Sequence, residues 1–222
     1  MRAIKFVILF AATASSVPLL AQPAGPAGPP ANLATNQPAN LFTNRAAYLT
    51  DVKHVGGPGL IPADYAYVTF KSSKFGFVMP AGFRLEAQDA QKVTLVSADF
   101  SCLLTFQVLD PAPPGGRELD PAFYRELLLG RHPGGKILEE FSLAAVSRRG
   151  PAFDLRWNAT GAVPRRERVL FISTDAGVLE FSLLSSLEKF DASQRGFSSL
   201  LRCFRAAEAN GRLEMPVLSD RF

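Results

Sequence analysis

The stretch that most restricts the fold is residues 65–83, YAYVTFKSSKFGFVMPAGF. β-Branched and aromatic residues dominate its first six positions, which favours a pleated strand. Polar residues 71–74 interrupt the run as a hairpin loop would, and residues 75–79 resume it. Pro80 cannot donate to a neighbouring strand, so the second strand is expected to stop there, and Gly76 indicates a bulge or the close approach of another group. The stretch therefore predicts an antiparallel hairpin at the start of the folded domain.

Further strands and two helices follow in the pattern of the remaining chain. Period-two alternation and apolar runs predict strand pairs at residues 92–98 with 101–109, 137–146 with 152–160, and 166–174 with 178–186. Asp120-Pro121 is typical of a helix start, and residues 191–194, DASQ, resemble a capping box. We therefore predict an α+β fold, a single antiparallel sheet of about six to seven strands with helices packed on its faces.

The same periodicities predict which side chains are buried, and Asp154, on the more polar face of its strand, is expected to pair with an arginine across the sheet. The predicted core consists of Phe77, Leu104, Phe106, Leu155, Trp157, Phe171, Phe181, Leu200 and Phe204.

The phrase FGFVMPAGF, followed by two strands, a helix, more strands and a final helix, resembles the PsbP-like superfamily. This group includes the extrinsic photosystem II subunit, Mog-type Ran-binding proteins and bacterial DcrB-like periplasmic proteins. The resemblance covers residues 65–205 and implies a PsbP-like α/β/α sandwich. Because members of the group perform unrelated tasks, it implies no particular activity.

The amino-terminal region predicts export. Residues 1–21 combine Arg2 and Lys5 with an apolar run and end on Ala21, the pattern of a cleaved secretory signal peptide. Residues 22–62, rich in Pro, Ala and Gly, are expected to form a disordered linker, although residues 41–55 could contain one short helix. The folded domain is expected at residues 63–206, and residues 207–222 as a loose tail. The predicted location is the bacterial periplasm or the extracellular space.

Charge gives no case for nucleic acid as a partner. The chain has 24 Lys+Arg and 20 Asp+Glu, and removal of Arg2 and Lys5 with the signal lowers the net charge from +4 to +2. The sequence also has no basic stripe interleaved with aromatic residues, the pattern typical of proteins that bind single-stranded nucleic acid. The apolar run of the signal is short for a membrane span, so no stable span is expected after cleavage. The expected partner is another envelope protein, and the oligomeric state is left open.

The common catalytic and cofactor motifs are missing from the sequence. It has no Gly-x-Ser-x-Gly elbow, phosphate loop, dinucleotide fingerprint or His-Glu-x-x-His, so no catalytic, cofactor-binding or metal-binding residue is predicted. Any Ser-His-Asp or Cys-His site would have to use His54 or His132, and both lie in Pro/Gly-rich loops. The sequence therefore favours a non-catalytic binding or assembly module. A small hydrolase with an unrecognised site and a small-ligand carrier are the alternatives.

Cys102 and Cys203 form a possible disulfide, because an exported chain meets an oxidising compartment. The bond requires Cα atoms within about 7 Å. Cys203, however, lies beside the apolar stripe of its predicted helix. Two buried free thiols are the alternative.

Overall fold

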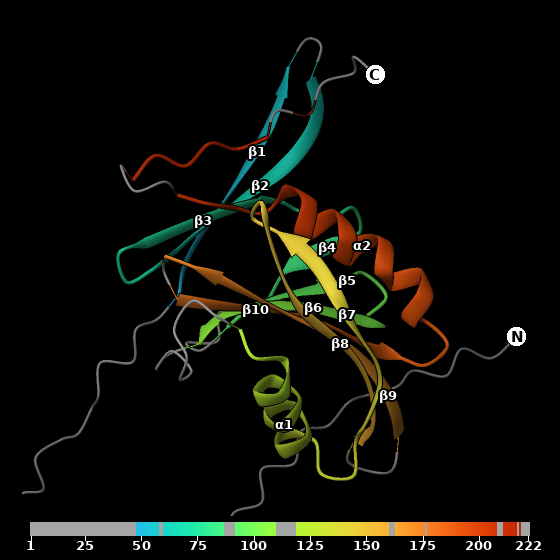
Figure 1. The fold of residues 1–222 in the computed structure, drawn as a ribbon. Helices are drawn as coiled ribbons and strands as arrows, with labels where there is room; N and C mark the ends of the chain where they lie inside the picture. Colours follow the sequence, from blue (N-terminus) through green and yellow to red (C-terminus); the bar gives the residue numbers. More distant parts are fainter. Residues whose placement is uncertain are drawn as a thin grey trace, which may run out of the picture. The chain divides into compact units, whose positions relative to one another are not determined.

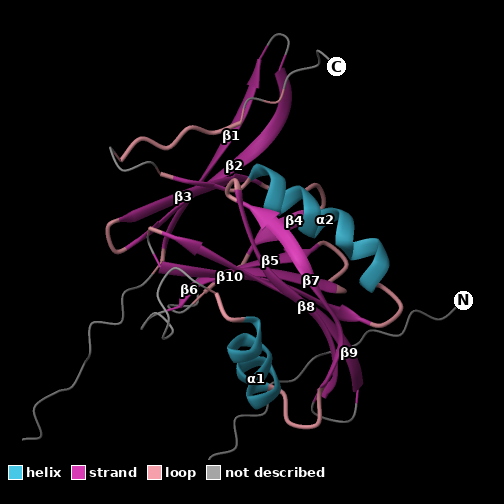
Figure 2. Ribbon diagram, viewed as in Figure 1, coloured by secondary structure: helices cyan, strands magenta, loops and turns pink. Residues whose placement is uncertain are grey.

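The structure of the chain is a computed structural model. It describes residues 48–57, 60–86, 92–109, 119–159, 163–175, 177–207, 211–216 and 218. The predicted signal peptide and most of the predicted linker lie outside these residues. The described part contains eleven strands and two helices (Figures 1 and 2).

Most of the strands belong to a seven-stranded sheet in which every pair is antiparallel. In spatial order its strands are β4 (Phe83–Leu85), β5 (Val93–Ser97), β6 (Cys102–Leu109), β10 (Gly177–Ser186), β9 (Val163–Thr174), β8 (Arg148–Ala159) and β7 (Lys136–Ala145). The register aligns Phe181 with Phe106 on one side and with Leu170 on the other, so apolar side chains of three central strands share one face.

A second, four-stranded sheet has the order β1 (Leu49–Gly57), β2 (Leu60–Phe70), β3 (Ser73–Val78) and β11 (Arg205–Ala206). The predicted hairpin is therefore present as β2 and β3, but the expectation of a single sheet is wrong. The reason lies at the corner after β3, where Pro80 ends the ladder and Gly82 takes a left-handed φ of 79°. The chain turns there and enters the other sheet as β4.

The two helices pack against opposite faces of the seven-stranded sheet (Figure 1). Helix α1 (Pro121–Arg131) buries Tyr124 and Leu128 against one face, and the Asp120 carboxylate accepts from the Ala122 amide as predicted. Helix α2 (Phe190–Cys203) packs on the other face, where β2 and β3 also contribute to the core. Its N-cap is Lys189, not the predicted Asp191.

Aromatic rings dominate the core between α2 and the two sheets. The centroid of Phe106 lies within 6.1 Å of five other aromatic ring centroids. Those rings belong to Tyr48, Phe75, Phe77, Phe181 and Phe204. Eight of the nine predicted core residues are buried; the exception is Trp157, which is only half-buried.

The predicted boundaries of the domain differ from the structure at both ends. Residues 49–57 pair with β2 as a strand, although they were placed in the linker and partly in a short helix. Near the other end, the Ile61 amide donates to the Leu218 carbonyl and the Tyr65 hydroxyl donates to the Pro216 carbonyl. Residues 211–216 and 218 therefore include contacts to β2 and are not a loose tail.

Gly76 shows why the carboxyl-terminal segment can lie so close to β3. A Cβ atom at this position would lie 2.4 Å from the Met215 sulfur and 3.0 Å from a Leu213 methyl carbon. The close approach predicted from this glycine is confirmed, and the approaching group is the chain's own terminal segment.

No helix in the described ranges is both long enough and apolar enough to cross a membrane.

Candidate functional site

A buried ion cluster lies on the α2 face of β8 and β9. Asp154 is fully buried, and Arg168 donates to it through Nε at 2.6 Å and Nη2 at 2.9 Å. Arg166 Nη2 donates to the same carboxylate at 2.8 Å, and both guanidinium groups lie over the Phe190 ring. The prediction that Asp154 pairs with an arginine across the sheet is confirmed, and the paired charges indicate a structural role.

A second polar cluster links the end of α1 to the sheet. The His132 and Trp157 rings stack with centroids 4.5 Å apart, and both rings place a nitrogen 3.2 Å from Glu167 Oε2. All three residues are at least partly buried. This arrangement explains why Trp157 is not enclosed as predicted, because its indole N–H has a polar partner near the surface.

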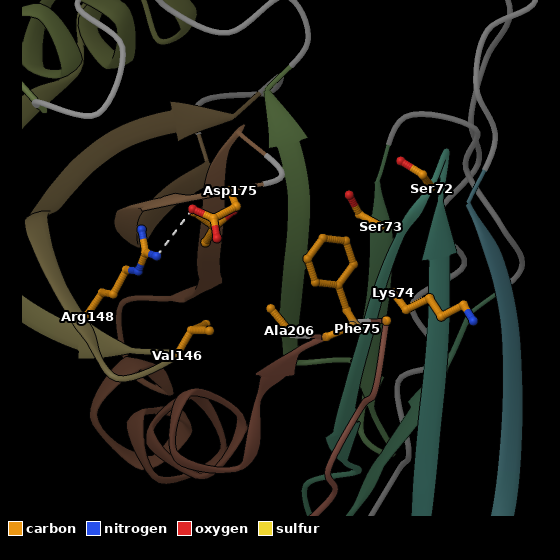
Figure 3. Close-up of a pocket in the computed structure, with 11 residues that line it drawn as sticks. Ser72, Ser73, Lys74, Phe75, Val146, Arg148, Asp175 and Ala206 are labelled. Carbon is orange, nitrogen blue, oxygen red and sulfur yellow. Dashed lines mark hydrogen bonds and ion pairs between the residues drawn. The ribbon is translucent and has the colours of Figure 1, made fainter. Parts of the chain in front are cut away.

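One opening lined by residues of both sheets, here called the inter-sheet cavity, has a volume of about 630 Å³. Figure 3 shows it between the β2–β3 turn and the turns that join β7 to β8 and β9 to β10. Its lining residues are Ser72, Ser73, Lys74, Phe75, Val146, Arg148, Thr174, Asp175, Ala206, Ala207 and Gly211. The volume falls in the range of about 300–1,000 Å³ that is usual for ligand pockets.

The inter-sheet cavity has an apolar floor and a polar rim. Phe75, Val146 and Ala206 form the floor (Figure 3), where Phe75 is 1% exposed because its ring packs in the aromatic core. On the rim, Arg148 donates to the Ser173 carbonyl at 3.0 Å and forms an ion pair with Asp175 at 3.5 Å. The rim charges facing the space thus compensate each other, because the Lys74 side chain points away from it (Figure 3).

Local sequence explains the shape of one wall of this cavity. Val146 and Ser147 have φ values of 54° and 58°, the positive values that a tight two-residue hairpin turn requires. A β-branched residue rarely adopts this conformation, so Val146 is held there by its packing against the aromatic core. The turn thus places Val146 in the floor of the cavity.

A second opening, here called the hairpin cavity, lies between the β1–β2 hairpin and the end of α2, with a volume of about 630 Å³. His54 Nδ1 lies 2.8 Å from Asp64 Oδ1, and both side chains are more than half exposed. Cys203 lines the same cavity. Among the described contacts, no hydrogen bond joins the Cys203 thiol to His54.

The two predicted disulfide partners are free thiols in the structure. The Cys102 thiol interacts with the Ser193 hydroxyl in the first turn of α2, and burial raises the pKa of Cys102 to about 11. Cys203 is the last residue of α2, ten residues further on, which corresponds to about 15 Å along a helix axis. The pairing stays a prediction, and it would require a different placement of α2 over β6.

The groups whose pKa values are displaced lie outside both cavities. Hydrogen bonds from Ser101 and Ser97 lower the pKa of Asp99 to about 2 in the exposed β5–β6 turn. Burial raises the pKa of Tyr124 on the sheet-facing side of α1. The described residues contain no group of three or more His, Cys, Asp or Glu side chains arranged to hold a metal.

Sequence reasoning identified neither cavity. The lining of the inter-sheet cavity comes from four segments between Ser72 and Gly211. The turn at Val146 could not be recognised from the sequence, because valine is not one of the residues that indicate a turn with positive φ. Gly76 alone indicated, in the sequence, that another group could approach the first hairpin.

Neither a protein-family model nor a curated protein matches the chain. Similar solved structures include a Pseudomonas aeruginosa protein of unknown function, with 12% identity and a TM-score of 0.36 over 69% of this chain and 78% of that one. The cyanobacterial PsbP of Synechocystis has 10% identity and a TM-score of 0.39 over 72% of this chain and 92% of its own. LpqN of Mycobacterium tuberculosis, described as involved in cell envelope biogenesis, has 12% identity and a TM-score of 0.38 over 72% and 92%. At these levels the similarities assign no function to the chain.

Proposed function

We propose that this protein is an exported, non-catalytic binding module of the cell envelope that receives an apolar side chain of a partner protein in the inter-sheet cavity. The proposal rests on the composition of the cavity lining. Phe75, Val146 and Ala206 form an apolar floor, and the Arg148–Asp175 ion pair lies on the rim. A small number of polar groups around an apolar floor is typical of binding sites.

Export rests on the pattern of residues 1–21, and placement of the domain in the PsbP-like superfamily rests on FGFVMPAGF and the order of elements. The intact mass of the protein made by its native host tests the first point. We expect a mass that lacks residues 1–21. A soluble protein that retains them would contradict export.

Site-specific cross-linking in the native host tests the binding site. A photo-reactive amino acid at Ser72, on the rim of the cavity, should capture one partner protein. The same amino acid at Leu138, which is 51% exposed on β7, serves as the control and should not capture it. Equal capture at both positions would contradict the proposal.

Filling the cavity gives an independent test. Ala207→Trp places a large ring at the cavity wall, whereas Ala98→Trp adds the same ring to an exposed turn outside both cavities. We expect the first variant to lose the cross-link at Ser72 and the second to keep it, with both melting temperatures close to that of the wild type. Retention of the cross-link in Ala207→Trp would show that the cavity is not the binding site.

A thiol hydrolase at the hairpin cavity is the second candidate function, because His54, Asp64 and Cys203 line one space. A Cys–His site needs the thiol within hydrogen-bond reach of the imidazole, which would require the hairpin to close on α2. Hydrolysis of an activated ester by the wild type, Cys203→Ser and His54→Ala tests this candidate. Equal background rates would favour the binding module, and loss of activity in both variants would favour the hydrolase.

A further inference from the structure

Strand β1 is the edge strand of the described four-stranded sheet, and it carries an unusual share of exposed apolar side chains. In the described part of the chain it pairs with β2 on one side. Eight of its nine residues are exposed. Half of the large apolar side chains that are exposed in this part of the chain lie on the β1–β2 hairpin, namely Leu49, Val52, Val55 and Ile61.

Such an edge is open to pairing with another strand unless charges repel the newcomer. The two ionisable side chains of β1 with opposite signs are Asp51 and Lys53, 3.6 Å apart on one face and more than 60% exposed. Charges of one sign along β1 would repel a second copy of the same strand. The opposite charges of Asp51 and Lys53, two residues apart, can instead pair with the opposite charges of that copy.

The order of residues in β1 selects one antiparallel register for self-pairing. With Val52 opposite Val52 of a second copy, each Asp51 faces a Lys53 and each Leu49 faces a Val55. A shift of the symmetric pairing by one position to either side brings Asp51 opposite Asp51 or Lys53 opposite Lys53. Like charges directly opposite each other destabilise a strand pair, whereas opposite charges and apolar pairs stabilise it.

We propose that a second copy of this chain docks on β1, antiparallel and centred on Val52, so that the two four-stranded sheets become one continuous sheet. The pairing covers the exposed side chains of Leu49, Val52 and Val55 and turns the Asp51–Lys53 contacts into contacts between the two chains. This surface is separate from the inter-sheet cavity, so the inference goes beyond the proposed function and stands independently of it.

Cysteine cross-linking tests the register directly. In an antiparallel pair, Cα atoms of directly opposed residues lie about 4.5–5.5 Å apart, within the roughly 4.4–6.8 Å that a disulfide spans. Val52→Cys should therefore form an intermolecular disulfide under mild oxidation of the purified protein. Val55→Cys is the matched control, because the two copies of residue 55 would lie six residues, about 20 Å, apart along the strands. Equal cross-linking of the two variants would overturn the proposal.

Charge exchange tests the same pairing without a covalent bond. Asp51→Lys and Lys53→Asp each place like charges opposite each other twice per dimer, and we expect each to weaken dimerisation about tenfold in analytical ultracentrifugation. The double variant restores opposite charges and should return the dissociation constant to near that of the wild type. A wild-type protein that stays monomeric at every concentration, or a double variant no better than the single ones, would overturn the proposal and assign this edge to a different occupant.

Discussion

The two ends of α2 are held in the structure by different kinds of interaction. At its carboxyl-terminal end, the Phe204 ring lies 4.8 to 5.9 Å, centroid to centroid, from four other rings, those of Phe75, Phe77, Phe106 and Phe181. At its amino-terminal end, Phe190 lies beneath two guanidinium groups that share the buried Asp154. The first end depends on packed volume, and the second depends on a carboxylate that no apolar group can replace without leaving two arginines unpaired. One helix is thus secured to one sheet face by both mechanisms.

The aromatic end is expected to be the more sensitive to truncation. Phe204→Ala removes a ring that contacts four others in a fully buried position, and we expect a loss of about 3–5 kcal/mol in the free energy of unfolding. Phe204→Leu keeps most of the volume and should cost less, about 1.5 kcal/mol. Denaturant unfolding measures both. Equal costs for the two variants would show that packed volume is not what secures this end.

The ionic end should respond to loss of charge at constant shape. Asp154→Asn removes the buried counter-charge that Arg166 and Arg168 share, and we expect a loss of about 2 kcal/mol in the free energy of unfolding. This is less than the roughly 3–5 kcal/mol of a fully buried pair, because Arg166 and Arg168 are 28% and 15% exposed and can regain water.

A matched control for this prediction lies beside the same arginine. Asp191 is 85% exposed and 3.8 Å from Arg166, so Asp191→Asn should leave stability unchanged within error. Similar effects of Asp154→Asn and Asp191→Asn on the denaturation midpoint would contradict the role given to burial.

The two cysteines differ in the same way as the two ends of α2 near which they lie, Cys102 under its first turn and Cys203 at its last residue. Ionisation of these thiols should have almost no effect on stability near neutral pH. With a pKa of about 11, Cys102 is roughly 0.1% thiolate at pH 8, and it is buried, so it should be alkylated at least 100-fold more slowly than Cys203. Mass spectrometry after limited alkylation of the native protein measures the two rates, and Cys102→Ala identifies the fast site. Equal rates would contradict the placement of Cys102 under α2.

Titration of the denatured, unreduced protein decides the predicted disulfide. Two free thiols per chain would exclude the Cys102–Cys203 bond, and none would establish it once intermolecular bonds are excluded on a non-reducing gel.

A reduced Cys102 also makes the free energy of unfolding depend on pH. Since its pKa is raised in the folded state, its contribution to stability is present below about pH 9 and is lost as the pH rises through about 11. Cys102→Ala should remove that loss.

The elements that the sequence predicted correctly are those whose structure is determined by their own local residue pattern and not by contacts with distant segments. The alternation in β8 and the Asp120-Pro121 start of α1 needed no other segment for their recognition. Strand β1 was missed because its apolar residues are exposed and follow no inward period, so its pairing is decided by β2. The second sheet, the burial of Asp154 and both cavities depend on segments that are distant in the sequence, and no local pattern encodes them.

The place of β11 in the four-stranded sheet affects the order in which the protein can fold. Strand β3 pairs with residues 205–206, and the hydrogen bond between Tyr65 and Pro216 spans 151 positions of the chain. Until residues 205–215 have been synthesised, this edge of β3 lacks its β11 partner and Gly76 is not covered by Met215. Contacts of such long sequence separation slow folding, because the chain must close a large loop before they form. If the chain is threaded through a secretion channel, this late closure favours a state that is still unfolded when it reaches the channel.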